Sequence, residues 1–68
     1  MKKQLTVNGE SIQSLSETLL NFLNEINLNY NKNIAIAVNE EIVEKNNWKN
    51  YKLKPGDKIE IVEPLKGG

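Results

Sequence analysis

The chain has 68 residues, enough for one small domain with a single compact apolar core. It contains no Cys and no His, which excludes disulfides, thiolate metal sites and the commonest general base. Nine lysines balance nine carboxylates, and because there is no Arg and the lysines are spread along the chain, the composition argues against nucleic-acid binding.

The first predicted element is a tight β-hairpin. Residues 4–7 alternate between polar and apolar, and Asn8-Gly9 separates them from a second short alternation. Asn and Gly tolerate the positive φ that both central positions of a type I′ turn require. We therefore expect strands at 2–7 and 10–14. The side chains expected to face the core are Leu5, Val7 and Ile12.

The next stretch predicts an amphipathic helix of about three turns, laid on a sheet. Ser14 and Glu17 have the spacing of a capping box, and Ser16 is an equally good N-cap. The opposite side of the helix is polar. The apolar residues that recur at helical period are Leu15, Leu19, Phe22, Leu23 and Ile26.

An asparagine-rich loop, 27–33, is expected to lead into a central strand at 34–38. Ile34, Ile36 and Val38 would share one face of this strand, and Ala35 and Ala37 the other. The small alanine face would let another surface come close. The alternative is a strand that is simply buried on both faces.

The last third of the chain predicts two further strands around an irregular segment. Residues 40–43 give a short strand, and one helical turn is expected near Trp48, which we interpret as a lid on the core. Pro55-Gly56 suits the central positions of a type II turn. The final strand is expected at 59–62, and Pro64 should end it.

The order of these elements predicts an α+β fold. A helix between strands is a crossover, which we expect to place the first and third strands side by side in parallel. The last strand would pair beside the first. The result is a β-grasp (ubiquitin-like) fold, with a mixed sheet of four to five strands packed on one helix; an α+β roll with another strand order is the alternative. The domain would span residues 1–64 and leave a flexible tail at 65–68.

The chain lacks the groups from which most active sites are built, so we predict that it is not an enzyme and holds no metal or cofactor. Glu40 and Glu41 would point to opposite faces of a strand. We interpret Ser14 and Ser16 as helix caps. The carboxylates interpreted as solvated surface are Glu10, Glu17, Asp57 and Glu60.

No apolar run approaches the ~20 residues of a membrane span, and the first residues do not form a signal peptide, so we expect a cytoplasmic protein.

The terminal pair Gly67-Gly68 is the main functional feature. Because glycines carry no side chain, this pair could thread a narrow channel and bring the Gly68 carboxylate to a distant active site. A free carboxylate is a poor electrophile, and enzymes activate it with ATP as an acyl-adenylate, from which a sulfur or nitrogen nucleophile displaces AMP. The alternative is an inert, disordered end.

The full chain resembles the small β-grasp sulfur carriers, and most closely the ThiS-like carriers of thiamine biosynthesis. The start "VNGE" is similar to the start of the family's sequences. One departure is Glu44-Lys45, where the family usually has Pro-Arg: Lys45 keeps the positive charge but lacks the guanidinium fork of an arginine. The remaining residues that carry the resemblance are Val38-Asn39, Ile42-Val43, Trp48, Leu53, Gly56-Asp57 and Gly67-Gly68.

The resemblance implies a monomeric carrier that supplies no catalytic residue. A ThiF-like E1-type adenylating enzyme would use ATP and Mg to adenylate Gly68, and a persulfide donor would convert the adenylate to a thiocarboxylate. A ThiG-like thiazole synthase would then receive the sulfur for the thiazole moiety of thiamine. The tail residues Leu65, Lys66 and Gly67 would enter the partner. The expected docking face is the sheet face turned from the helix, with Val62, Ala35 and Ala37; alternatively, Val62 only packs beside its neighbouring strand.

Three alternatives stay open. A MoaD-like carrier for molybdopterin synthesis would share the chemistry at Gly68 but serve another acceptor. A ubiquitin-like modifier would pass its activated Gly68 to a lysine of a target protein. A non-catalytic β-grasp interaction module would keep full activity after removal of Gly67-Gly68.

Overall fold

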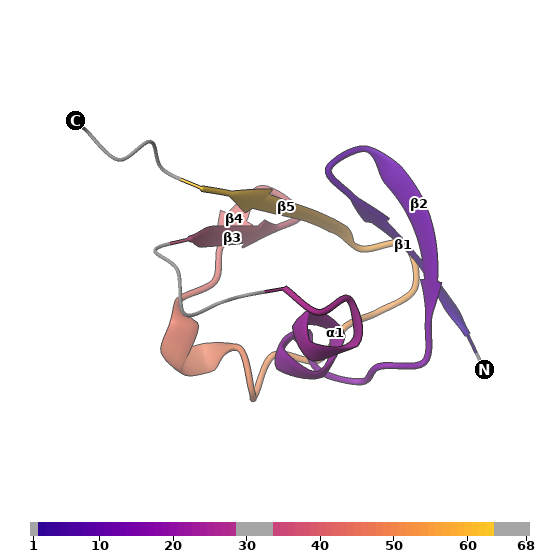
Figure 1. Ribbon diagram of the computed structural model, residues 1–68, viewed down its shortest axis with the longest axis horizontal. Helices are drawn as coiled ribbons and strands as arrows, with labels where there is room; N and C mark the ends of the chain where they lie inside the picture. Colours follow the sequence, from indigo (N-terminus) through magenta and orange to yellow (C-terminus); the bar gives the residue numbers. More distant parts are fainter. Residues whose placement is uncertain (1, 29–33, 64–68) are drawn as a thin grey trace.

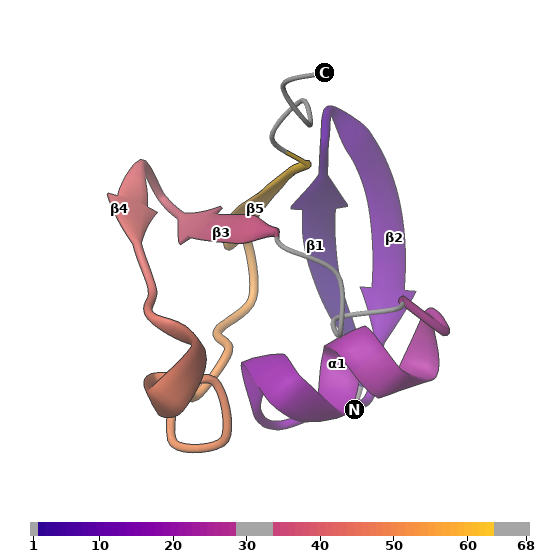
Figure 2. The ribbon, with the colours of Figure 1, turned by 60° about the vertical axis from the view of Figure 1, so that its left-hand side comes forward.

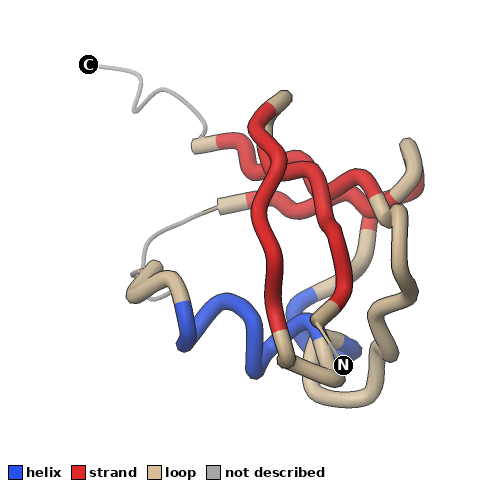
Figure 3. The backbone as a smooth tube through the Cα atoms, turned by 90° about the vertical axis from the view of Figure 1, so that its right-hand side faces the viewer, coloured by secondary structure: helices blue, strands red, loops and turns tan. Residues whose placement is uncertain are grey.

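The computed structural model describes residues 2–28 and 34–63. Within them a single mixed sheet carries one α-helix and one 3-10 turn, both on the same side (Figures 1 and 3). This confirms the predicted β-grasp fold. The elements are β1 (Lys3–Val7), β2 (Glu10–Ser14), α1 (Leu19–Glu25), β3 (Ala35–Val38), β4 (Glu41–Ile42), η1 (Lys45–Asn47) and β5 (Lys58–Val62).

The strand order is β2-β1-β5-β3-β4, with β5 at the centre. β5 runs parallel to β1 and antiparallel to β3. The last strand therefore pairs with the first as predicted, but the expectation that the first and third strands are parallel neighbours is wrong. The crossover through α1 starts from β2, which is antiparallel to β1, so the strand that β3 parallels is β2.

The hairpin forms as predicted. Asn8 and Gly9 have φ of 49° and 87°, and Val7 lies opposite Glu10, as a two-residue loop with positive φ requires. Leu5 and Val7 are buried, and Ile12 packs against the core while partly exposed.

The helix is shorter than predicted and begins later. Thr18 is the N-cap and accepts from Asn21 N through its side chain, so neither Ser14 nor Ser16 caps the helix. The first two backbone amides of the helix have no acceptor within it and donate to the segment that follows η1. Leu19 N donates to the Tyr51 carbonyl, and Leu20 N donates to the Trp48 carbonyl. These tertiary partners fix where the helix starts. Leu15 is left outside it and is 61% exposed, contrary to the predicted apolar stripe.

The helix ends at a Schellman motif. Asn27 has a φ of 60°, and its N–H donates to the Asn24 carbonyl while Leu28 N donates to that of Leu23. The loop predicted at 27–33 lies mostly outside the described residues.

The core fills the space between the sheet and the helix. Trp48 is 2% exposed, and its indole Nε1 donates to the Val43 carbonyl at 2.8 Å, which confirms its role as a lid on the core. The other buried apolar residues are Leu5, Val7, Leu19, Phe22, Leu23, Ile36, Val38, Val43, Leu53 and Ile59.

Two turns position the sheet. Gly56 has a φ of 88° and Asp57 N donates to the Lys54 carbonyl, as the predicted type II turn requires. Asn39 and Glu40 have φ of 53° and 72° and make the turn between β3 and β4. The prediction of a strand at 40–43 is therefore wrong for Glu40, which lies in this turn.

Candidate docking face

The chain leaves the sheet through β5, the central strand. Leu65, Lys66, Gly67 and Gly68, predicted to enter a partner, lie outside the described residues, as does Pro64. What the structure does describe is the strand that leads to them and the sheet face around it.

The three predicted docking residues lie together on the sheet face turned from α1. Ala35 is directly opposite Val62 in the β3–β5 register, and residues opposite each other in a sheet share a face. The other face of these strands is buried, with Ile36 at 0% and Ile59 at 1% exposed. Val62 is 55% exposed, so it is not covered by a neighbouring strand.

Ile42 extends this group and was not predicted to belong to it. It lies opposite Ala37 across the β3–β4 pair and is 69% exposed. The sequence did carry a signal, because adjacent residues of the strand expected at 40–43 would point to opposite faces, and an inward Val43, which is buried, leaves Ile42 outward. We define the outer apolar patch as Ala35, Ala37, Ile42 and Val62.

The hairpin half of the same face is polar. Gln4 Nε2 donates to Ser11 Oγ at 2.8 Å across the β1–β2 pair, and Gln4 also lies opposite Gln13. The outward face thus carries the apolar patch on β3, β4 and the end of β5. It is bordered by Glu60, which lies opposite Ala37, and by the polar side chains of β1 and β2. An apolar patch bounded by polar surface is typical of a protein–protein contact.

Asn39 and Asp57 hold the start of β5. Asn39 N donates to the Lys58 carbonyl at 2.8 Å, and Lys58 N donates back to Asn39 Oδ1 at 3.1 Å. Asn39 Nδ2 donates to Asp57 Oδ1 at 3.0 Å, and Lys54 N donates to Asp57 Oδ2 at 2.8 Å. Asp57 is 6% exposed, so its assignment to solvated surface is wrong: both carboxylate oxygens are used in the turn.

A second polar group joins the end of β2 to the end of α1. The hydroxyls of Ser14 and Ser16 donate to Glu25 Oε1 at 2.5 Å and 2.7 Å, and Ser16 N donates to Ser14 Oγ. These hydroxyls lower the pKa of Glu25 below its ordinary value because they stabilise the charged carboxylate, and Lys2 adds a smaller effect. The serines thus fasten the helix to the hairpin, which replaces the predicted capping role.

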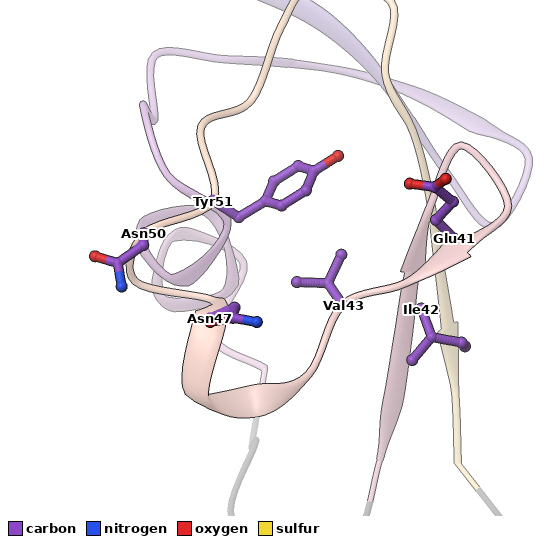
Figure 4. A pocket seen from close by; sticks show the side chains of 6 residues that line it. All are labelled: Glu41, Ile42, Val43, Asn47, Asn50 and Tyr51. Carbon is purple, nitrogen blue, oxygen red and sulfur yellow. The ribbon is translucent and has the colours of Figure 1, made fainter.

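A shallow hollow of about 320 Å³ lies between β4 and the chain after η1. Figure 4 shows the Tyr51 ring on one side of the hollow, with its hydroxyl directed toward the side of Glu41. The Val43 side chain lies between Tyr51 and Ile42. Burial raises the pKa of Tyr51, and the charges of Asp57 and Glu41 add to the effect. The phenol of Tyr51 therefore stays in its neutral form to a higher pH than an ordinary tyrosine. Ile42 lines this hollow and also belongs to the outer apolar patch, so the two surfaces are continuous.

Chemistry-bearing clusters are sparse in the described part of the chain. No group of three or more Asp or Glu residues there is placed to hold a metal ion. Within the same residues no helix has the length and apolarity that a membrane crossing requires. The arrangement offers a contact face and a route to the C-terminus.

Comparison with known proteins agrees with this arrangement. The family model of the ThiS family matches residues 3–68. Among solved structures, the chain is similar to the crystal structure of a thiamine biosynthesis protein (ThiS) from Geobacter metallireducens, with a TM-score of 0.82 and 22% identity. That match covers 96% of this chain and 99% of the other. The search of curated protein sequences returned no match.

Proposed function

The chain belongs to the ThiS family of small sulfur carrier proteins, and we propose that it carries sulfur as a thiocarboxylate on Gly68 for the thiazole moiety of thiamine. The observation that carries the proposal is the family match over residues 3–68, which includes Gly67-Gly68. The outer apolar patch supports it, because a carrier needs a surface for the enzymes that act on its end.

The proposed activation begins at the C-terminal carboxylate. A carboxylate oxygen of Gly68 attacks the α-phosphorus of MgATP in a ThiF-like enzyme and pyrophosphate leaves. The product is an acyl-adenylate, in which the carbonyl carbon of Gly68 is electrophilic. The terminal sulfur of a persulfide attacks that carbon and AMP leaves, which gives an acyl disulfide. A second thiol cleaves the S–S bond, so that a disulfide forms on the donor side and the thiocarboxylate stays on Gly68.

The thiocarboxylate has two properties that suit a carrier. Its soft sulfur is a better nucleophile than the carboxylate oxygen that it replaces, and it travels bound to protein, not as free sulfide. A ThiG-like synthase would receive it. In this proposal the carrier's own residues bind and present: Ala35, Ala37 and Val62 dock, and Leu65, Lys66 and Gly67 reach the active site.

The test is the intact mass of the chain after incubation with a ThiF-like enzyme, MgATP and a persulfide source. We expect a gain equal to replacing one oxygen by one sulfur, mapped to Gly68, and no gain in a chain that lacks Gly67-Gly68. An AMP adduct that goes on to form lysine conjugates would instead indicate a ubiquitin-like modifier. No change, with an enzyme shown to be active on another carrier, would contradict the proposal.

The acceptor needs a separate measurement. The thiocarboxylate form would be incubated with a ThiG-like synthase and, in parallel, with the acceptor partner of a MoaD-like carrier. Loss of the sulfur mass to the first partner alone supports the thiazole branch. Loss to the second alone would assign the chain to molybdopterin synthesis.

A further inference from the structure

Within residues 2–28 and 34–63, the strand pairing on the β1 side of β5 stops before the end of β5. The parallel β1–β5 pairing covers only Thr6 with Lys58 and Val7 with Ile59, because the hairpin turns away after Val7. β3 still pairs with the last residues of β5, up to Val62. Ile61 is therefore held by a main-chain ladder on one side only.

The side chain of Asn8 fills the missing place. The parallel ladder proceeds by Thr6 N donating to the Asp57 carbonyl and Asn8 N to the Ile59 carbonyl. Continued by one step, it would have Ile61 N donate to the backbone carbonyl of Asn8. Instead, Ile61 N donates to Asn8 Oδ1 at 2.9 Å, and Asn8 Nδ2 reaches the Ile61 carbonyl at 3.4 Å.

The carboxamide of Asn8 can take the place of a backbone peptide group in the ladder. A carboxamide carries the same carbonyl acceptor and N–H donor as a peptide group, so the asparagine side chain extends the ladder by one unit. Asn also tolerates the φ of 49° that the turn imposes at this position. Figure 2 shows the hairpin tip beside the end of β5, where this contact is made.

We propose that Asn8 is a positioning residue for the activation of Gly68: by fixing the backbone of Ile61 it sets the direction in which the C-terminal segment leaves the sheet. The inference rests on the proposed function. A start that is already ordered in the free carrier lowers the entropy lost when the partner binds. The effect therefore belongs in the KM for the carrier and not in kcat.

The decisive variant is Asn8→Gly. Glycine keeps the positive φ of the turn, since Gly-Gly also suits a type I′ hairpin, and removes only the carboxamide. With a ThiF-like enzyme and MgATP we expect the KM for the carrier to rise by about 5- to 30-fold, the factor that corresponds to ordering one backbone residue, while kcat stays within about 2-fold. The Ile61 amide should exchange with solvent faster than in the wild type.

Gly9→Ala is the matched control. Gly9 has a φ of 87° and no atom lies within 4 Å of the position of an added Cβ, so the substitution strains the same turn without removing a hydrogen-bonding group. It should lower the melting temperature at least as much as Asn8→Gly and leave the KM unchanged. A KM that rises equally in both variants would show that turn stability alone is responsible, and would overturn the inference.

Asn8→Asp separates the two bonds. Aspartate keeps an acceptor for Ile61 N but has no donor for the Ile61 carbonyl, so we expect a KM within about 3-fold of the wild type. A KM as high as that of Asn8→Gly would overturn the role assigned to Oδ1. If the wild type itself is not adenylated, the proposed function falls and this inference with it. Normal wild-type adenylation with an unchanged KM for Asn8→Gly overturns the inference alone.

Discussion

Asn39 Nδ2 donates to Asp57 Oδ1 across 3.0 Å, and so joins the turn after β3 to the turn before β5. The two residues are 18 positions apart in the chain. Asp57 also accepts from Lys54 N, so its carboxylate closes one turn and fastens it to another. Because Asp57 is nearly buried, its removal leaves an amide and a backbone N–H without their acceptor.

We therefore expect Asp57→Ala to lower the free energy of unfolding by about 1–3 kcal/mol. Urea unfolding followed by circular dichroism would measure the change. Glu60→Ala, at an exposed position of β5, is the control and should stay within about 0.5 kcal/mol of the wild type. An Asp57→Ala variant as stable as the control would show that water replaces the carboxylate at no cost.

The pH dependence of stability should reveal the group around Glu25. Its pKa is lower in the folded state, because hydroxyls of Ser14 and Ser16 donate to the charged form. A lowered folded pKa stabilises the fold above the pKa of an ordinary glutamate, about 4.3, and that stability is lost as pH falls through the folded value. Glu25→Gln cannot titrate and should lose less stability on acidification.

The measurement is urea unfolding of wild type and Glu25→Gln at about pH 6 and about pH 3, with the free-energy difference between them expected to shrink at the lower pH. Glu25 is exposed, so the change should be small. Glu17→Gln removes an exposed glutamate before α1 and controls for net charge. Equal acid sensitivity of wild type and Glu25→Gln would mean that the hydroxyls do not favour the ionised carboxylate.

The local signals in the sequence predicted most elements of the fold. Asn8-Gly9 and Pro55-Gly56 each specify a turn through the φ that their glycine tolerates, and both turns are present. Alternation placed Ile36 and Val38 in the core and Ala35 and Ala37 on the other face. These features depend on residues close in the chain, so a pattern is enough to predict them.

Most of the errors depend on contacts between residues that are distant in the chain. The helix begins at Leu19 because the carbonyls of Tyr51 and Trp48 accept its first two amides, and no helical period within 14–26 carries that information. The carboxylate of Asp57 and the carboxamide of Asn39 are polar side chains used inside turns, where composition alone suggests solvated surface. For the candidate site, period-two alternation could have revealed Ile42, whereas its pairing with Ala37 required the register of β3 and β4.

Docking through the outer apolar patch should respond to a charge at Val62. Val62 is 55% exposed, so Val62→Glu should change the melting temperature little. At a desolvated contact an unpaired carboxylate is costly, and we expect the KM for adenylation by a ThiF-like enzyme to rise at least about 10-fold. Gln13→Glu adds the same charge to the polar half of the face, where β2 is exposed, and should change the KM little. Equal effects from both substitutions would point to net charge and not to the patch.

Gly67→Val should slow the activation of Gly68 strongly and leave the fold intact. The family match includes Gly67, and the pair Gly67-Gly68 would have to pass a channel too narrow for a side chain. A β-branched residue next to the reacting carboxylate adds width and restricts the backbone, and a displacement of about 1 Å at a reacting group can cost about 100-fold in rate. We therefore expect the rate of acyl-adenylate formation to fall by about 100-fold or more, with an unchanged melting temperature.

Gly67→Ala is the matched control for size, and an intermediate rate is expected because one methyl group restricts the backbone less than a branched side chain. Pyrophosphate exchange with labelled ATP would report adenylation directly, before any sulfur is transferred. If Gly67→Val is adenylated as fast as the wild type, the argument that a bare glycine pair must thread a narrow channel is contradicted. Adenylation would then require only the Gly68 carboxylate itself. If adenylation is normal but the thiocarboxylate does not form, the constraint on width lies at the sulfur-transfer step.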